Sequence, residues 1–248
     1  MSRIIGVIPS RYASSRFPGK PLAPIAGIPL VVRVIQRVRL ASRLDDVIVA
    51  TDDERIAAVV REHGATAVMT PSELPSGTDR IACAIRGLEA DVVVNIQGDE
   101  PLIDPALVDA VGASLADSDA WDMSTAAAPV TTPEDLASPD VVKVVRAFDN
   151  RALYFSRAPI PYRRGQSLPF PPLPGIHLRH IGIYGYRRDF LERLVKLPPS
   201  PLETTEMLEQ LRALQIGARI LVLDATAPSL GVDTPEDVRR VEQALARS

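Results

Sequence analysis

The 248-residue sequence has few of the side chains on which several classes of protein depend. The single cysteine, Cys83, leaves no second thiol for a disulfide or a cysteine-based metal site, and fits a reducing compartment. Aromatic residues make up 4% of the chain, too few for a surface that stacks single-stranded bases, and the net charge of −3 also disfavours nucleic acid. No apolar stretch approaches the roughly 18 residues of a membrane span, and no export signal precedes Pro9. We therefore expect a cytoplasmic protein without a nucleic-acid or membrane partner.

Acidic residues are absent from the first 44 positions, although the chain as a whole carries 31 acidic against 28 basic residues. Three of the basic residues in this segment, Arg11, Arg16 and Lys20, lie in a loop at 9–21, directly after the apolar run at 4–8. Cations concentrated where a strand ends indicate a polyanionic ligand, and nucleotide phosphates are the natural candidate. The alternative is a solvated basic loop without a ligand.

The basic loop differs from a P-loop. That motif places Gly-Lys-Ser/Thr at the start of a helix, so that backbone N–H groups surround the phosphates. Here Lys20 is followed by Pro21, and each proline in the loop removes one backbone donor. We therefore expect side-chain charge to hold the phosphates, with Arg11 and Arg16 as planar forks and Lys20 as a mobile point charge.

Short β-branched runs alternate with helical patterns along the chain, which predicts an α/β fold with a mostly parallel sheet and helices on both faces. We treat residues 1–248 as a single domain with a β-rich insertion at about 120–185. Within the insertion, 141–146 and 151–155 read as a hairpin, and the proline-rich segment 156–176 as an extended loop. The other expected strands are 4–8, 46–51, 66–69, 91–97, 180–186 and 219–223. The expected helices are 30–40, 53–63, 79–88, one that begins at Asp104-Pro105, 187–195, 204–214, and a last one that begins at Thr234-Pro235.

Two aspartates follow strand ends without an evident local role. Asp99 lies just past the strand 91–97, and the helix after it is already capped by Asp104. Asp233 precedes the last helix, which Thr234 caps with Asp237 as its capping-box partner. Because ligands of open α/β sheets bind at the carboxyl ends of the strands, we expect both carboxylates to bind Mg²⁺ together with substrate phosphates. The chance presence of two such residues remains the alternative.

Several longer motifs resemble those of one family, the CMP-Kdo synthetases, also called 3-deoxy-manno-octulosonate (Kdo) cytidylyltransferases. The resemblance runs in register from residue 4 to about 243. The motifs that carry it are Pro9-x-Arg11-x4-Arg16-x-Pro18-Gly19-Lys20-Pro21-Leu22, Val49-Ala50-Thr51-Asp52, Ser76-Gly77-Thr78-Asp79-Arg80, Asn95-Ile96-Gln97-Gly98-Asp99-Glu100-Pro101, Ala152-Leu153-Tyr154-Phe155-Ser156-Arg157, His180-x-Gly182-Ile183-Tyr184-Gly185-Tyr186, Leu208-Glu209-Gln210-Leu211-Arg212 and Gly231-Val232-Asp233-Thr234-Pro235-Glu236-Asp237.

The resemblance implies a Rossmann-like nucleotidyltransferase fold and a cytosolic, Mg²⁺-dependent enzyme that activates Kdo with CTP for lipopolysaccharide synthesis. It also implies a homodimer with the β-rich insertion at the contact. Asp99 and Asp233 would bind Mg²⁺, and together with Arg11 and Lys20 they would form the catalytic set. The nucleotide would be held by Arg11, Arg16, Lys20, Ser76, Gly77 and Gln97. The sugar pocket would be lined by Arg80, Gln97, His180, Tyr184, Glu209 and Gln210, with Arg80 and His180 as partners for the sugar carboxylate.

The residue patterns agree with parts of this assignment. Strand alternation over 180–186 places His180, Gly182, Tyr184 and Tyr186 on one face. In the expected helix 204–214, Glu206, Glu209 and Gln210 lie together opposite a leucine face.

Three alternatives remain open. A sister cytidylyltransferase could use 8-amino-Kdo or, less in keeping with the basic loop, a sialic acid. A nucleotide-binding module without turnover would bind CTP but release no pyrophosphate. The presence of both Asp99 and Asp233 favours an enzyme over such a module.

Overall fold

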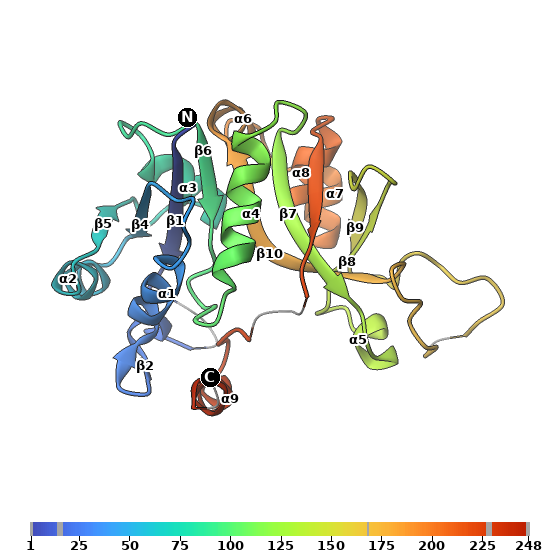
Figure 1. Ribbon diagram of the computed structural model, residues 1–248, viewed down its shortest axis with the longest axis horizontal. Coiled ribbons are helices and arrows are strands. Elements are labelled where there is room, and N and C mark those ends of the chain that lie inside the picture. Colours follow the sequence, from blue (N-terminus) through green and yellow to red (C-terminus); the bar gives the residue numbers. More distant parts are fainter. Residues whose placement is uncertain (1, 14–16, 168, 227–229, 247–248) are drawn as a thin grey trace.

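A computed structural model describes residues 2–13, 17–167, 169–226 and 230–246. Among the described residues, nine strands form one sheet, along which seven follow the order β11-β7-β10-β6-β1-β4-β5 (Figure 1). Their bounds are β1 (Ile4–Ser10), β4 (Asp46–Thr51), β5 (Thr66–Met69), β6 (Val92–Asn95), β7 (Met123–Pro129), β10 (Leu178–Arg187) and β11 (Ile220–Asp224). Neighbouring pairs are parallel except at β10, which runs antiparallel to both β6 and β7. The mostly parallel α/β sheet is confirmed.

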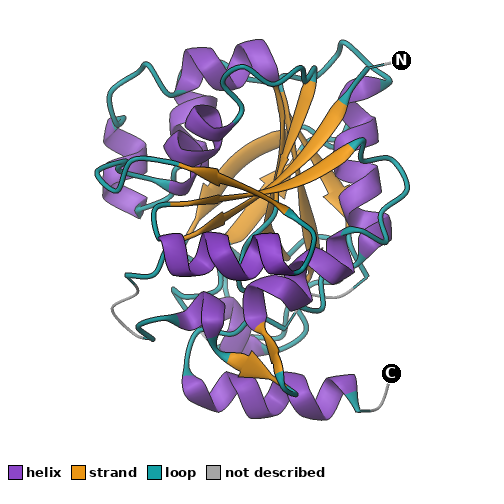
Figure 2. Cartoon of the chain, turned by 90° about the vertical axis from the view of Figure 1, so that its left-hand side faces the viewer, coloured by secondary structure: helices purple, strands orange, loops and turns teal. Residues whose placement is uncertain are grey.

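Helices cover both faces of the sheet because its strands are apolar on both sides. Within β1, Ile4 and Ile8 join one buried cluster, whereas Ile5 and Val7 join the other. The first cluster packs against α1 (Leu30–Val38), α2 (Glu54–Glu62) and α4 (Pro105–Ala116), and the second against α3 (Gly77–Ala84) and α6 (Arg188–Leu194). Figure 2 shows the helical layers on the two sides of the strands.

The insertion expected at about 120–185 is only partly separate from this sheet. Both β7 and β10 lie in its middle, between β11 and β6. The sequence analysis missed β7 because its residues, MSTAAAP, are mostly small and lack the β-branched pattern of a buried strand. They suit a strand under a closely packed helix: the Ser124 hydroxyl donates to the Val111 carbonyl of α4 at 2.9 Å.

The expected hairpin, β8 (Lys143–Arg146) and β9 (Ala152–Ser156), lies off the main strand order. Its first strand pairs with β10, and the Val222 amide of β11 donates to the Asn150 carbonyl in its turn at 2.9 Å. The loop that follows β9 projects from the body of the protein (Figure 1). Asn150 adopts a left-handed conformation, φ 64°, in the hairpin turn. The described residues between β9 and β10 contain no helix or strand, as the prolines predict. The short α5 (Pro133–Ala137) supports the loop, since Leu136 and Phe170 share a small buried cluster.

The helix expected over 204–214 is two helices, α7 (Pro201–Glu206) and α8 (Gln210–Gln215). Met207 ends α7 in a left-handed conformation, φ 55°, and its side chain is 75% exposed. The expectation that Glu206, Glu209 and Gln210 share one helical face is therefore wrong. We call the segment 206–210 the α7–α8 corner.

The last helix, α9 (Pro235–Leu245), begins with the expected capping box of Thr234 and Asp237. It packs beside a two-stranded ribbon of β2 (Pro24–Ile25) and β3 (Ile28–Pro29), where the Glu242 carboxylate accepts a hydrogen bond from the Ala26 amide at 2.7 Å. No helix in the part of the chain that the structure describes has the length and apolar character to cross a bilayer.

Candidate active site

A cleft of about 370 Å³ opens at the carboxyl ends of β1 and β6, the edge at which open α/β sheets bind ligands. Its walls come from the end of β1, the start of α3, strands β6 and β10, and the α7–α8 corner. The lining residues are Pro9, Arg11, Gly77, Thr78, Asn95, Gln97, Gly182, Tyr184, Tyr186, Met207, Leu208, Glu209 and Gln210. Polar groups from segments more than a hundred residues apart thus face one space.

The basic loop reaches this cleft through Arg11. The loop folds back on itself where Gly19, in a left-handed conformation at φ 72°, donates its amide to the Tyr12 carbonyl at 3.0 Å. The Arg55 guanidinium of α2 stacks 3.4 Å from the centre of the Tyr12 ring and holds the loop against this helix. Lys20 then begins a single 3-10 turn, Lys20–Leu22. Arg16, expected to bind phosphate, lies outside the described residues.

Lys20 brings the two expected metal ligands together. Its ammonium donates to Asp99 Oδ2 at 2.7 Å and to Asp233 Oδ1 at 3.3 Å. The Val232 amide also donates to the Asp99 carbonyl at 2.9 Å, which ties the two acidic segments to each other. A side chain at Gly98 would approach the Pro9 carbonyl to 2.9 Å, so glycine lets this segment pass close to the end of β1.

Asp99 and Asp233 have the donor chemistry of a magnesium site. Two carboxylates meet at one point where a cation, the Lys20 ammonium, already balances their charge. Within the described ranges, no group of three or more His, Cys, Asp and Glu residues could hold a metal. Mg²⁺ does not need one, because it commonly binds one or two carboxylates and completes its shell with waters and substrate phosphates. The residues present fit that mode of binding.

The other end of the cleft is polar but poorly solvated. Gln97 donates through Nε2 to the Gly182 carbonyl at 3.0 Å, and Thr78 donates to Glu209 Oε2 at 2.7 Å. Burial raises the pKa values of Tyr184 and Tyr186 well above the usual value for a phenol. Both phenols therefore stay neutral and offer hydrogen bonds without charge.

A bulge in β10 shapes this wall. The pairing with β7 shifts by two residues between Ile181 and Tyr184, so Gly182 lies in the bulge. Because the shift is even, His180, Tyr184 and Tyr186 keep the same side of the sheet, as the alternation predicts. The bulge turns the Gly182 carbonyl toward Gln97.

Comparison with known proteins assigns the family. Residues 5–220 match the family model described as cytidylyltransferase. The chain belongs to the cytidylyltransferase family. A 3-deoxy-manno-octulosonate cytidylyltransferase of Geobacter sulfurreducens is 46% identical over 98% of this chain and 99% of its own length. One of Leptothrix cholodnii is 51% identical, over 96% of this chain and 89% of its own.

A solved structure agrees with this assignment. A CMP:2-keto-3-deoxy-manno-octonic acid synthetase in complex with CTP superposes with a TM-score of 0.92, at 40% identity and with 99% of both chains covered. The nucleotidyltransferase fold implied by the sequence motifs is therefore confirmed, as is the resemblance itself.

The structure of this cytidylyltransferase corrects the expected role of Arg80. The side chain is fully buried and takes no part in the cleft lining. Its guanidinium forms an ion pair with Asp52 at 2.9 Å and a hydrogen bond with the Thr70 hydroxyl at 2.5 Å. Arg80 therefore joins α3 to the strands β4 and β5 and is not positioned to bind a sugar carboxylate.

His180 is not among the residues that line the cleft. Its ring packs edge-on to Phe155 with the ring centres 5.1 Å apart, and its Nε2 is 2.9 Å from the Thr125 hydroxyl. Burial lowers the pKa of His180 to about 3, so the imidazole is neutral near pH 7. The ring also contacts Tyr184, whose ring centre is 5.3 Å away, and so supports a residue of the cleft wall.

The remaining predicted residues lie in three places: the cleft lining, the cluster around Lys20 and the start of α3. Arg11, Gly77, Gln97, Tyr184, Glu209 and Gln210 line the cleft. Lys20, Asp99 and Asp233 meet in one cluster. Ser76 caps α3 by accepting from the Asp79 amide and donating to the Asp79 carboxylate at 2.7 Å, so its local role is structural.

Three polar side chains of the cleft were given no site role in the sequence analysis: Thr78, Asn95 and Tyr186. All three lie within the quoted motifs, beside residues that were chosen. Asn95 could have been found, because strand alternation places it on the same face as Gln97.

Proposed function

We propose that this cytidylyltransferase transfers CMP from CTP to Kdo, with release of pyrophosphate, as a step of lipopolysaccharide biosynthesis. The observation that carries the proposal is the meeting of Lys20, Asp99 and Asp233, contributed by three distant segments. The cleft beside β1 and β6 provides polar walls, with Asn95, Gln97 and Gln210 among them, that suit a hydroxylated sugar. The names of the relatives and the CTP complex of the similar structure support the same substrates.

The reaction is an in-line displacement at the α-phosphorus. The anomeric hydroxyl oxygen of Kdo forms a bond to this phosphorus while the bond to the oxygen bridging to the β-phosphorus breaks. Pyrophosphate leaves with the electron pair of that bond, and the hydroxyl proton passes to solvent. Arg11, Arg16 and Lys20 hold the triphosphate, and the residues of β10 and the α7–α8 corner hold the sugar. Catalysis by the protein thus consists mainly of positioning and charge neutralisation.

Asp99 and Asp233 would hold Mg²⁺. The bound metal supplies neutralisation of phosphate charge and lowers the pKa of a nearby hydroxyl. The acidic pair also keeps Lys20 at the cleft, where its ammonium can bind the phosphates in turn.

Pyrophosphate release tests this proposal. The purified protein is incubated with Mg²⁺, each of the four NTPs, and Kdo, 8-amino-Kdo or a sialic acid. We expect release only with CTP and the greatest kcat/KM with Kdo. Preference for 8-amino-Kdo would assign the sister activity, whereas CTP binding without release would indicate a non-catalytic module. Loss of release in EDTA, reversed by Mg²⁺, would support the metal requirement.

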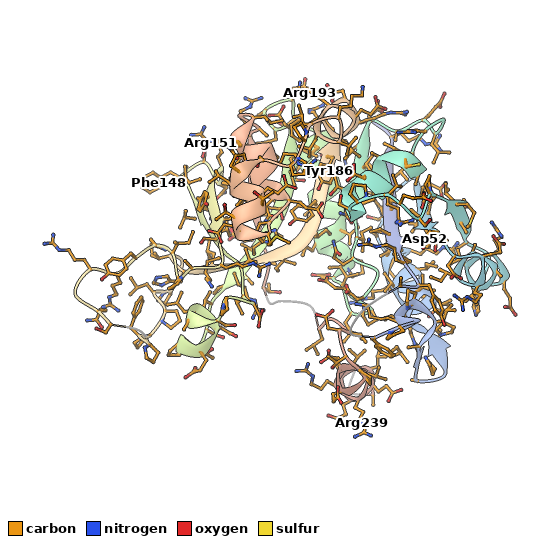
Figure 3. All side chains as sticks on the ribbon, turned by 180° about the vertical axis from the view of Figure 1, so that it is seen from behind. Asp52, Phe148, Arg151, Tyr186, Arg193 and Arg239 are labelled. Carbon is orange, nitrogen blue, oxygen red and sulfur yellow. The ribbon has the colours of Figure 1, made fainter. Side chains whose placement is uncertain are left out.

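We also propose a homodimer that forms through the hairpin β8–β9. Phe148, at the tip of the hairpin, is fully exposed, and Leu153 on β9 is 54% exposed. Figure 3 shows Phe148 pointing away from the body of the protein. Large apolar side chains exposed together are typical of a contact with another chain. The cytoplasm remains the proposed compartment, since the lone Cys83 fits a reducing environment.

A further inference from the structure

Asn95 occupies the floor of the cleft. It is the last residue of β6, lies opposite Tyr184 in the pairing with β10, and is 4% exposed. Its side-chain oxygen, Oδ1, is buried and has no hydrogen-bond partner. Buried polar atoms are almost always paired in folded proteins, so an unpaired one that lines a cleft indicates a missing ligand group.

The neighbours of Asn95 explain why its Oδ1 is the atom that has no hydrogen-bond partner. The side chains of Asn95 and Thr78 hydrogen-bond the Tyr186 hydroxyl, which fixes the amide on the strand. With its other end held in this way, Oδ1 is the atom of this cleft-lining side chain that is left without a partner. Gln210, across the cleft on α8, is 5% exposed and has the complementary atom, a buried Nε2 donor without a partner.

An unpaired acceptor and an unpaired donor in one cleft match the chemistry of a sugar hydroxyl. A hydroxyl donates one hydrogen bond and accepts others, so it can satisfy either atom. The phenols of Tyr184 and Tyr186 beside Asn95 are neutral, so they can line a pocket for a hydroxyl group without adding charge.

We propose that Asn95 determines specificity for the sugar acid by accepting a hydrogen bond from one of its hydroxyl groups through Oδ1. This inference rests on the proposed function, because it takes the acceptor substrate to be a polyhydroxylated acid. It adds a residue to the substrate side of the site and predicts that one hydroxyl of the sugar is recognised at the floor.

The test compares Asn95→Leu, which has nearly the same shape but no polar atom, with the wild-type protein. We expect the KM for Kdo to rise about 10-fold, the loss expected for one buried hydrogen bond. The KM for CTP should stay within about twofold. The melting temperature is measured alongside, because the substitution removes the hydrogen bond to the Tyr186 hydroxyl as well as the unpaired Oδ1. Asn95→Ser serves as the second variant in case the leucine protein fails to fold.

Ser124→Ala is the matched control. Ser124 is equally buried in the same sheet but is fully hydrogen-bonded to Val111 and lies outside the cleft lining. Its loss should lower the melting temperature and leave the KM for Kdo unchanged. Both variants lose a buried hydrogen bond, and only the Asn95 variant should raise the KM for Kdo.

A series of Kdo analogues, each lacking one hydroxyl, identifies the contact. One analogue should lose about 10-fold in kcat/KM with the wild-type protein and lose nothing further with Asn95→Leu. An unchanged KM for Kdo in both Asn95 variants, or an equal penalty with every analogue, would overturn the inference. The proposed function fails separately, if the wild-type protein releases no pyrophosphate with any acid sugar.

Discussion

At the scale of single residues, Lys20 has the most consequential surroundings. Its ammonium lies between the carboxylates of Asp99 and Asp233, with 16% of its side chain exposed. Removing one carboxylate leaves the other still paired with Lys20, so the fold should tolerate it. The same change removes half of the expected magnesium ligands.

We predict that Asp99→Asn lowers kcat at least about 100-fold, because a metal-held charge at the reacting phosphate is lost. The free energy of unfolding should change by less than about 1 kcal/mol, since the ion pair is partly exposed. Pyrophosphate release over a Mg²⁺ titration and Mn²⁺ binding by paramagnetic resonance measure the effect.

Asp104→Asn is the control for this substitution. Asp104 lies in the same loop but caps α4, accepting from the Ala106 amide at 3.0 Å, and asparagine caps helices equally well. It should keep full activity. Near-normal turnover of Asp99→Asn at low Mg²⁺ would reject the metal assignment.

The buried imidazole of His180 makes a prediction about pH. Its pKa is about 3 in the folded protein and 6.5 when unperturbed, so the unfolded chain binds the proton more readily between these values. The neutral ring contributes its full stability above pH 6.5 and loses it as the pH falls toward 3. Between pH 7 and pH 5 the free energy of unfolding of the wild type should fall by about 2 kcal/mol more than that of His180→Gln.

Urea unfolding at half-unit pH intervals measures this difference. The comparison with His180→Gln cancels the carboxylates, which titrate in both proteins. Parallel pH profiles for the two proteins would show that His180 is not a desolvated, neutral ring.

At the scale of elements, the α7–α8 corner depends on Glu206. This carboxylate accepts from the Ser156 hydroxyl at 2.6 Å and from the Arg157 amide at 2.9 Å, and so holds the corner against β9. The Arg157 guanidinium donates back to the Glu206 carbonyl at 2.8 Å. The corner carries Glu209 and Gln210, so its position sets one wall of the cleft.

We predict that Glu206→Ala lowers the free energy of unfolding by about 1–3 kcal/mol, because buried donors lose their acceptor. The KM for the sugar should rise more than the KM for CTP, since Arg11 and Lys20, the proposed phosphate ligands, lie on other segments than the corner. Denaturant unfolding and steady-state kinetics measure both effects.

Glu192→Ala on α6 provides the comparison. Glu192 forms an exposed ion pair with Arg188 one turn away, which contributes little to stability. It should leave both the unfolding free energy and the two KM values near those of the wild type. Equal behaviour of the two variants would show that the Glu206 contacts do not position the corner.

At the scale of the whole molecule, the exposed apolar surface of the β8–β9 hairpin predicts that two copies of the protein form a dimer. We expect the double variant Phe148→Asp, Leu153→Asp to sediment as a monomer and the wild type as a dimer, because charge would be buried in the contact. Leu40→Asp, at a residue 65% exposed beyond the end of α1, should remain dimeric. A monomeric wild type, or a dimeric double variant, would contradict the proposed contact.

Much of the fold follows from local patterns in the sequence. The strands 46–51 and 66–69 have the predicted bounds, and α4 and α9 begin at the predicted caps. Two predictions failed where local pattern carries little information. The small residues of β7 gave no strand signal, and nothing in the run 204–214 marks Met207 as the residue at which the helix breaks.

The features of the candidate site also divide into those that the sequence predicts and those that only the structure reveals. The sequence by itself determined the charge of the basic loop, the aspartates left over after the caps, and the faces of the strands, since each depends on near neighbours in the chain. Only the tertiary structure decided which polar groups meet: Asp233 reaches Lys20 across 213 positions, and Asp52, not a substrate, takes the Arg80 guanidinium. The reason is physical, because periodicity specifies which way a side chain faces, whereas its partner depends on how the sheet orders its strands.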